Sequence, residues 1–115
     1  MTKNPIKYWF YSDDFFFECD KGWYPLLEEL SDKIDKIFKT KYPDLMEDFQ
    51  VLQVKEKFAT LRFYVSSAPQ EIYNLIHEYE NKSGNICESC GKPGKLTEKH
   101  MYLRTLCEEC YNAER

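Results

Sequence analysis

Two pairs of cysteines near the end of the chain constrain its fold more than any other feature. Cys87 and Cys90 form one C-x-x-C pair, and Cys107 and Cys110 form a second after sixteen intervening residues. A C-x-x-C turn directs two thiolates the same way, so two such turns supply the four ligands of a tetrahedral zinc ion. Four protein ligands close the coordination sphere and leave no position for substrate or water. The spacing therefore predicts one structural Zn²⁺ per chain, held in a small zinc ribbon.

The same cysteines have other interpretations. A redox dithiol needs only one C-x-x-C pair and usually lies in a βαβ unit, which the sequence does not indicate. Four cysteines can also hold an iron–sulfur cluster, although paired C-x-x-C turns at this separation are more typical of zinc. His100 is the one rival ligand, but four cysteines already satisfy the metal. The remaining cysteine, Cys19, is predicted to be a free thiol, buried as a small hydrophobe.

Length and charge narrow the class of protein. The 115 residues allow one compact domain, or a domain of residues 1–84 with a zinc ribbon at 85–115. The formal charge is −4, and a four-thiolate zinc site would take it to about −6, which opposes nonspecific binding to phosphate. No apolar run approaches the length of a membrane span, and the N-terminus lacks a signal peptide's apolar segment. Thiols arranged as metal ligands fit a reducing compartment, which predicts a cytoplasmic protein.

Residues 1–84 predict an α+β domain whose first part is rich in aromatic residues. The runs 7–11 and 15–20 are expected to be short strands, joined as a hairpin by the acidic turn between them. The apolar periodicity that begins at Leu26 predicts an amphipathic helix ending near Lys41.

A second hairpin and a second helix complete this domain. Residues 49–54 and 60–65 have the composition of paired strands, connected by 55–59. The outward face of this second hairpin is interpreted as an ordinary solvated face, with Lys55, Lys57, Arg62 and Tyr64. The run Ser67-Ala68-Pro69-Gln70 fits a capping box that opens the helix, and Gly84 suits a left-handed position past its end. The predicted fold class is α+β, a small antiparallel sheet packed with two helices, plus a C-terminal four-cysteine zinc ribbon.

Within the ribbon, Gly91 directly follows Cys90. A glycine there lets the backbone turn closely and aim N–H groups at the thiolates. Residues 95–97 and 101–106 are expected to be the strands of the ribbon.

Three segments together resemble a group of small zinc-ribbon proteins encoded by bacteriophages and prophages. They are Gly22-Trp23 before a leucine-rich helix, the run K-E-K-F-A-T-L-R-F-Y-V at 55–65, and the two C-x-x-C turns with Gly91 and Thr105-Leu106 beside them. The resemblance covers the chain from about Glu18 onward. The chain departs from the pattern at Ala59, where glycine is expected, and at Tyr102, near an expected tryptophan. Since the group has no established activity, the resemblance implies a phage origin more than a mechanism.

The function favoured by these observations is non-enzymatic binding of a host or phage protein, in the manner of an inhibitor of a host defence or other host protein. Aromatic residues make up 17% of the chain, which exceeds what a core of this size requires, and exposed Tyr and Trp anchor protein interfaces. The predicted contact surface lies near the N-terminus and consists of Tyr8, Trp9, Tyr11, Asp13, Asp14 and Trp23. The sequence predicts neither the partner's identity nor the oligomeric state.

Two other functional classes are less favoured. A nucleic-acid-binding zinc ribbon would use a basic face made of Lys92, Lys95, Lys99, His100 and Arg104, although glutamates in the same segment balance that charge. An enzyme is the least favoured class, because the chain shows no nucleophile–base pair, no glycine-rich phosphate loop and no open metal site. Stacking of a small nucleotide signal on aromatic residues is neither supported nor excluded.

Overall fold

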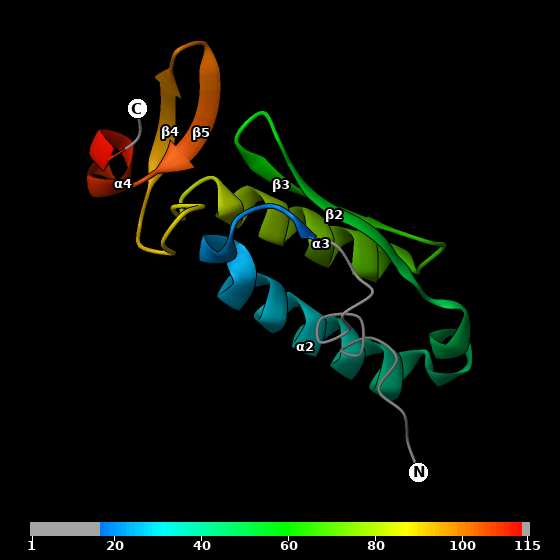
Figure 1. Cartoon of the computed structure of the whole chain (residues 1–115). Coiled ribbons are helices and arrows are strands. Elements are labelled where there is room, and N and C mark those ends of the chain that lie inside the picture. Colours follow the sequence, from blue (N-terminus) through cyan, green and yellow to red (C-terminus); the bar gives the residue numbers. More distant parts are fainter. Residues whose placement is uncertain (1–16, 114–115) are drawn as a thin grey trace.

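Helices and a small sheet form one part of the molecule, and a hairpin with a short helix forms its end (Figure 1). The computed structural model describes residues 17–113. Its elements are β1 (Phe17–Glu18), η1 (Lys21–Trp23), α2 (Tyr24–Lys41), η2 (Pro43–Asp48), β2 (Val51–Lys57), β3 (Thr60–Val65), α3 (Gln70–Ser83), β4 (Lys95–Lys99), β5 (Tyr102–Leu106) and α4 (Glu108–Ala113). The predicted α+β class is confirmed.

The larger sheet has the strand order β1-β2-β3. β2 and β3 form the predicted antiparallel hairpin, with Val54 opposite Phe63. β1 pairs with β2 in the parallel direction. Strands joined by a tight turn are antiparallel, so within the described residues β1 is not part of a hairpin. Of the predicted N-terminal hairpin, residues 7–11 and 15–16 lie outside the described residues. The predicted strand at 15–20 is confirmed only in part, because β1 ends at Glu18.

The core lies between this sheet and the two long helices. Val54, Leu61 and Phe63 on the sheet are buried, and the apolar stripes of α2 and α3 meet them. The α2 stripe includes Leu27, Leu30, Ile34 and Phe38, and the α3 stripe includes Ile72, Ile76 and Tyr79. Each such side chain contributes about 1.5–3 kcal/mol by leaving water. The helical periodicity in the sequence therefore identified the residues that join the helices to the sheet.

α3 ends at Ser83, beside the predicted Gly84, but the capping at both of its ends differs from the prediction. The N-cap is Pro69, in extended conformation and without a side-chain hydrogen bond, so the capping box is wrong. Pro69 lacks an N–H and its φ is fixed near −61°, so the helix begins at Gln70 directly after it without a hydroxyl cap. Gly84 has φ −69° instead of a left-handed conformation. The last carbonyls are satisfied by tight turns, because the N–H groups of residues 84–86 donate to the carbonyls of 81–83.

The turn between β2 and β3 is shorter than predicted. β2 continues to Lys57, and only Phe58 and Ala59 remain in the turn, with φ of 53° and 72°. Positive φ at both positions is the geometry of a tight hairpin turn that matches the twist of the strands. Ala59 thus adopts the left-handed conformation that glycine favours. Two hydrogen bonds hold it: its N–H donates to Glu56 Oε2 at 2.8 Å, and its carbonyl accepts from Thr105 Oγ1 at 2.7 Å.

Candidate metal centre

The structure brings the four predicted cysteines of the C-x-x-C pairs together. The Sγ atoms of Cys87, Cys90, Cys107 and Cys110 all lie within 4.8 Å of one another. Cys90 Sγ and Cys107 Sγ are 3.6 Å apart. A tetrahedral ion with bonds of about 2.3 Å to sulfur places its ligands about 3.8 Å apart. The spacing of the sulfurs therefore fits a metal ion at their centre.

Backbone turns position each pair of cysteines. The N–H of Gly91 donates to the Cys87 carbonyl at 2.9 Å, and Gly91 has φ 86°, as its glycine permits. As predicted, backbone N–H groups of this turn are directed at the sulfurs, those of Ser89 and Cys90 at Cys87 and that of Lys92 at Cys90, while the N–H of Gly91 itself closes the turn on a carbonyl. In the second pair the N–H of Cys110 points at Cys107 Sγ at 3.5 Å, in the first turn of α4. The sequence did not predict α4, which orients the last ligand.

The ionisation of the four thiols is coupled to the binding of a cation. Burial opposes ionisation of Cys87, but backbone N–H groups of Cys107, Cys90 and Ser89 lower the pKa of its thiol to about 6. The adjacent Cys107 and the burial of the group raise the pKa of Cys110 to about 12. Like charges in so small a volume disfavour one another, so the four sulfurs ionise together only around a positive ion.

The first cysteine turn packs directly on the start of α2. Gly22 N–H donates to the Glu88 carbonyl at 2.7 Å, and a Cβ atom on Gly22 would lie 2.2 Å from that same oxygen. The indole N–H of Trp23 donates to the Ile86 carbonyl at 2.9 Å. The first cysteine turn of the metal centre therefore packs against Gly22-Trp23. The sequence shows a glycine next to a tryptophan at this position, but it does not show which part of the chain the glycine contacts.

A polar cluster fixes the other side of this turn. Arg104 Nη2 lies 2.6 Å from Asp20 Oδ2 and 3.6 Å from Glu88 Oε1, while the Asp20 N–H donates to Glu88 Oε2 at 3.0 Å. Glu88 is 4% exposed, and burial raises the pKa of its carboxyl. Since Glu88 adjoins Cys87, these contacts link the metal centre to the segment before α2.

Cys19 and His100 lie outside the cysteine cluster. Cys19 is a free thiol, half-buried against the core. His100 occupies the turn between β4 and β5 with φ 53° and is exposed. Within residues 17–113, the four cysteines are therefore the group of side chains that could hold a metal ion.

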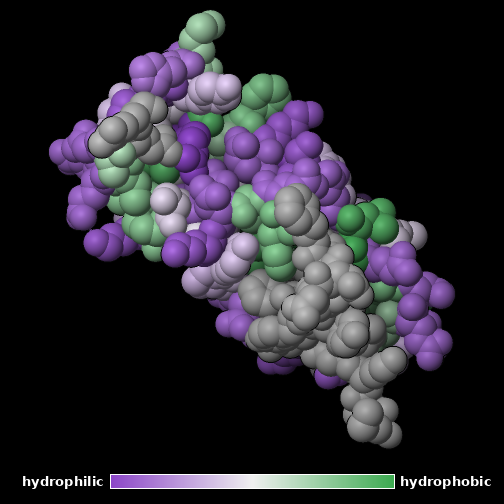
Figure 2. All heavy atoms as spheres, viewed as in Figure 1, coloured by the Kyte–Doolittle hydropathy of each residue, from purple (hydrophilic) through white to green (hydrophobic). Residues whose placement is uncertain are grey.

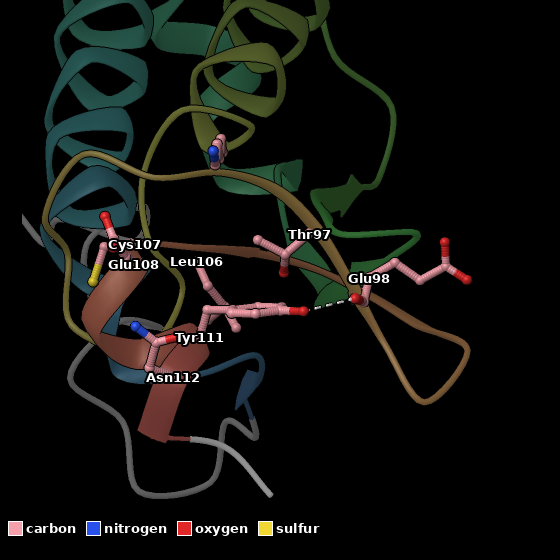
Figure 3. Close-up of a pocket in the computed structure, with 8 residues that line it drawn as sticks. Thr97, Glu98, Leu106, Cys107, Glu108, Tyr111 and Asn112 are labelled. Atoms are coloured by element: carbon pink, nitrogen blue, oxygen red, sulfur yellow. Dashed lines mark hydrogen bonds between the residues drawn. The ribbon is translucent and has the colours of Figure 1, made fainter.

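A pocket of about 410 Å³ lies beside the centre, between the β4–β5 hairpin and α4 (Figure 3). Tyr111 crosses it, and its hydroxyl donates to the Glu98 carbonyl at 3.4 Å. Lys99 Nζ donates to the Tyr111 carbonyl at 2.7 Å and lies 4.6 Å from the centre of the Tyr111 ring. These contacts attach α4 to the hairpin and so hold Cys110 in place.

The six residues of the predicted contact surface fall into two groups. Tyr8, Trp9, Tyr11, Asp13 and Asp14 lie outside the described residues. Trp23 is wrong as a contact residue, because its side chain is 0% exposed and its N–H is used within the chain. A bulky ring that closes the core beneath the cysteine turn is unavailable to a partner.

The basic residues of the ribbon do not form the open face that the nucleic-acid alternative requires. Lys92 pairs with Glu109 at 3.7 Å, Lys99 is bound to Tyr111, and Arg104 is bound to Asp20 and Glu88. Three of the five basic side chains are thus already paired, which leaves Lys95 and His100.

Comparison of the chain with family models, with curated proteins and with solved structures finds no match. Within residues 17–113, no helix combines the length and the apolar character that crossing a membrane requires.

Proposed function

We propose that the four cysteines hold one structural Zn²⁺ and that the protein is a non-enzymatic module that binds another protein. Four thiolates are the donor set of structural zinc sites, and they fill a tetrahedral sphere. Zinc would neutralise part of their charge and fix the two turns relative to each other, while the side chains of this chain supply every ligand. A filled sphere supports a structural role and not a reaction at the metal.

The observation that carries the binding proposal is a set of exposed apolar side chains on the β4–β5 hairpin. Its members are exposed large apolar side chains, namely Leu96 (61% exposed), Met101 (91%), Tyr102 (75%) and Leu103 (38%). Figure 2 shows apolar atoms at the tip of this hairpin, among hydrophilic neighbours. We call these four residues the hairpin surface.

The local backbone explains why these side chains are exposed. The hairpin has two strands, and Glu98 pairs with Leu103 while Lys99 pairs with Tyr102 near its tip. The base is buried at Thr105 and Leu106, where it meets the rest of the molecule. The tip extends beyond that contact, so its apolar side chains have no core to join. Leu96 and Leu103 lie on one face of the hairpin and Tyr102 on the other, with Met101 in the turn. Exposed apolar residues, with Tyr and Met among them, are typical of protein-binding sites.

The zinc site supports this surface mechanically. β5 leads directly into Cys107, and β4 follows the first cysteine turn. A metal that clamps both turns would hold the hairpin at a fixed angle before binding. Such preorganisation lowers the entropy cost of association. The resemblance to phage-encoded proteins supports a bacterial host protein as the partner, bound as an inhibitor binds its target.

Affinity purification from a bacterial host, with nuclease treatment, tests the proposal once the recovered partner is purified and its binding measured directly. Replacing Met101 and Tyr102 by serine should weaken binding at least tenfold, since central apolar anchors contribute about 2 kcal/mol or more. Leu45 and Leu52 are also exposed, at 48% and 57%, and lie outside the hairpin. Their replacement by serine is the matched control. Equal losses from both double variants, or recovery of nucleic acid alone, would contradict the proposal.

A further inference from the structure

The outward face of the β2–β3 hairpin carries a second surface, separate from the hairpin surface. The strand register places Gln53 beside Tyr64, Lys55 beside Arg62, and Lys57 beside Thr60. Their neighbours Val54, Leu61 and Phe63 point into the core. Since side chains alternate between the two faces of a strand, these six residues share the face opposite the core.

Within residues 17–113, the cations of this face have no carboxylate partner. Among the described residues, no ion pair involves Lys55, Lys57 or Arg62. Glu18, beside Lys55 in the sheet, instead accepts a hydrogen bond from Gln53 Nε2 at 2.7 Å. The Nε atom of Arg62 is buried without a hydrogen-bond partner, which is costly unless a ligand or water supplies an acceptor. The part of this face that residues 17–113 form thus carries three cations and one carboxylate.

Aromatic rings lie at both ends of this row of cations. Tyr64, 43% exposed, is two residues from Arg62, which is about 7 Å along a strand. Phe58, 69% exposed, lies in the turn at the other end, with Lys57 Nζ 5.7 Å from the centre of its ring. Unpaired cations between exposed rings match a strand of nucleic acid, whose phosphates take the cations and whose unstacked bases take the rings.

We propose that this sheet face binds single-stranded nucleic acid through Lys55, Lys57, Arg62, Tyr64 and Phe58. A duplex fits it less well, because paired and stacked bases are closed to aromatic stacking. The overall charge of −4 limits the attraction to short range, so binding depends strongly on salt. The inference rests on a different surface from the protein-binding proposal, and either can fail alone.

Fluorescence anisotropy with a labelled oligothymidylate of about 20 nucleotides tests this inference. Three phosphate contacts on a single strand predict a loss of affinity of roughly 20-fold between about 50 and 200 mM salt. Replacing Lys55 and Lys57 by glutamine should lower the affinity at low salt about tenfold or more, and should flatten the salt dependence. The matched control replaces Lys21 and Lys36, two exposed lysines elsewhere, and should leave both quantities nearly unchanged.

Tyr64→Ala separates stacking from charge. It should weaken binding about tenfold without changing the salt dependence, because it removes a ring and no cation. Zinc content and circular dichroism verify that each variant is folded. Absence of binding to the oligonucleotide at about 50 mM salt, or equal losses in the control variant, would overturn the inference. Equal binding of a polyglutamate peptide, with no dependence on Tyr64, would also overturn it and indicate an acidic protein segment instead.

Discussion

At the scale of single residues, Gly22 shows how one side chain sets the position of the metal centre. Its N–H and its lack of a Cβ atom let the Glu88 carbonyl approach to 2.7 Å from the Gly22 nitrogen. Any larger residue would push the first cysteine turn away from α2. Local patterns in the sequence assign Gly22 to a strand–helix break, and only the folded chain reveals the backbone that lies against it.

Gly22→Ala should therefore destabilise the protein by about 1–3 kcal/mol, as overpacking of a closely packed site does. The matched control is Gly84→Ala, where a Cβ atom would lie 3.5 Å from the nearest atom and φ is already −69°. That change should be neutral or slightly stabilising. Urea unfolding of the two variants gives the comparison, and equal stabilities would refute the proposed close contact.

Cys19 leads to a prediction about reactivity. Burial, followed by the carboxylates of Glu88, Asp20 and Glu56, raises the pKa of its thiol from 9.0 to about 12. Only thiolate reacts with iodoacetamide, so Cys19 should be labelled slowly near neutral pH until the protein unfolds. Cys19→Ala should leave zinc content unchanged. Rapid labelling of the native protein at Cys19, detected by peptide mass spectrometry, would contradict this assignment.

The same shift predicts a dependence of stability on pH. The thiol of the native protein keeps its proton to a higher pH than the thiol of the unfolded chain. Its contribution to the free energy of unfolding is therefore complete below about pH 9 and decreases as the pH rises toward 12. The free energy of unfolding of the native chain should thus fall more steeply in that window than that of Cys19→Ala. Parallel slopes for the two proteins would rule out a raised pKa.

At the scale of secondary structure, the chain was predictable where its signal is periodic. α2 ends at Lys41, and β3 buries Leu61 and Phe63, as expected from the spacing of apolar residues. The ends of α3 were not predictable in the same way, because proline geometry and tight terminal turns satisfied the backbone groups without the expected side chain. The parallel pairing of β1 depends on contacts distant in sequence, which local patterns do not contain.

The β2–β3 turn offers a test of backbone strain. Ala59 has φ 72°, which costs an alanine about 1–2 kcal/mol relative to glycine. Replacing Ala59 by glycine removes this cost, but the greater conformational entropy of glycine in the unfolded chain offsets part of the resulting stabilisation. We expect Ala59→Gly to stabilise the protein by about 0.5–1 kcal/mol, measured as a shift in thermal or urea unfolding. Ala68, which has no positive φ, provides the control, and Ala68→Gly should be neutral or destabilising. Destabilisation by Ala59→Gly would contradict the strain.

The cysteine turns should lose their structure when the metal is removed. In a Trp9→Phe background, Trp23 is the single tryptophan of the chain. Because its indole N–H donates to the carbonyl next to Cys87, a chelator should shift its emission to longer wavelength, and Cys107→Ser should do the same. Added Zn²⁺ should reverse the effect of the chelator. Unchanged emission after complete removal of metal would mean that the turns fold without it.

At the scale of the whole molecule, the cysteine-containing end is attached to the rest by several contacts. Besides Gly22 and Trp23, Thr105 Oγ1 donates to the Ala59 carbonyl, and Arg104 reaches Asp20. These hydrogen bonds run across the predicted division between residues 1–84 and 85–115. The cations differ between these two parts: those near the metal centre are largely paired, whereas those on the β2–β3 face have no ion-pair partner among the described residues.

X-ray absorption spectroscopy at the zinc edge, combined with elemental analysis of the purified protein, tests the central claim most directly. We predict one zinc per chain, coordinated by four sulfur atoms at about 2.3 Å and by no nitrogen or oxygen. Cys107→Ser should lower the zinc content. A coordination sphere with fewer than four sulfurs, a substoichiometric metal content in carefully prepared protein, or the visible spectrum of an iron–sulfur cluster would contradict the account of a closed, structural zinc centre.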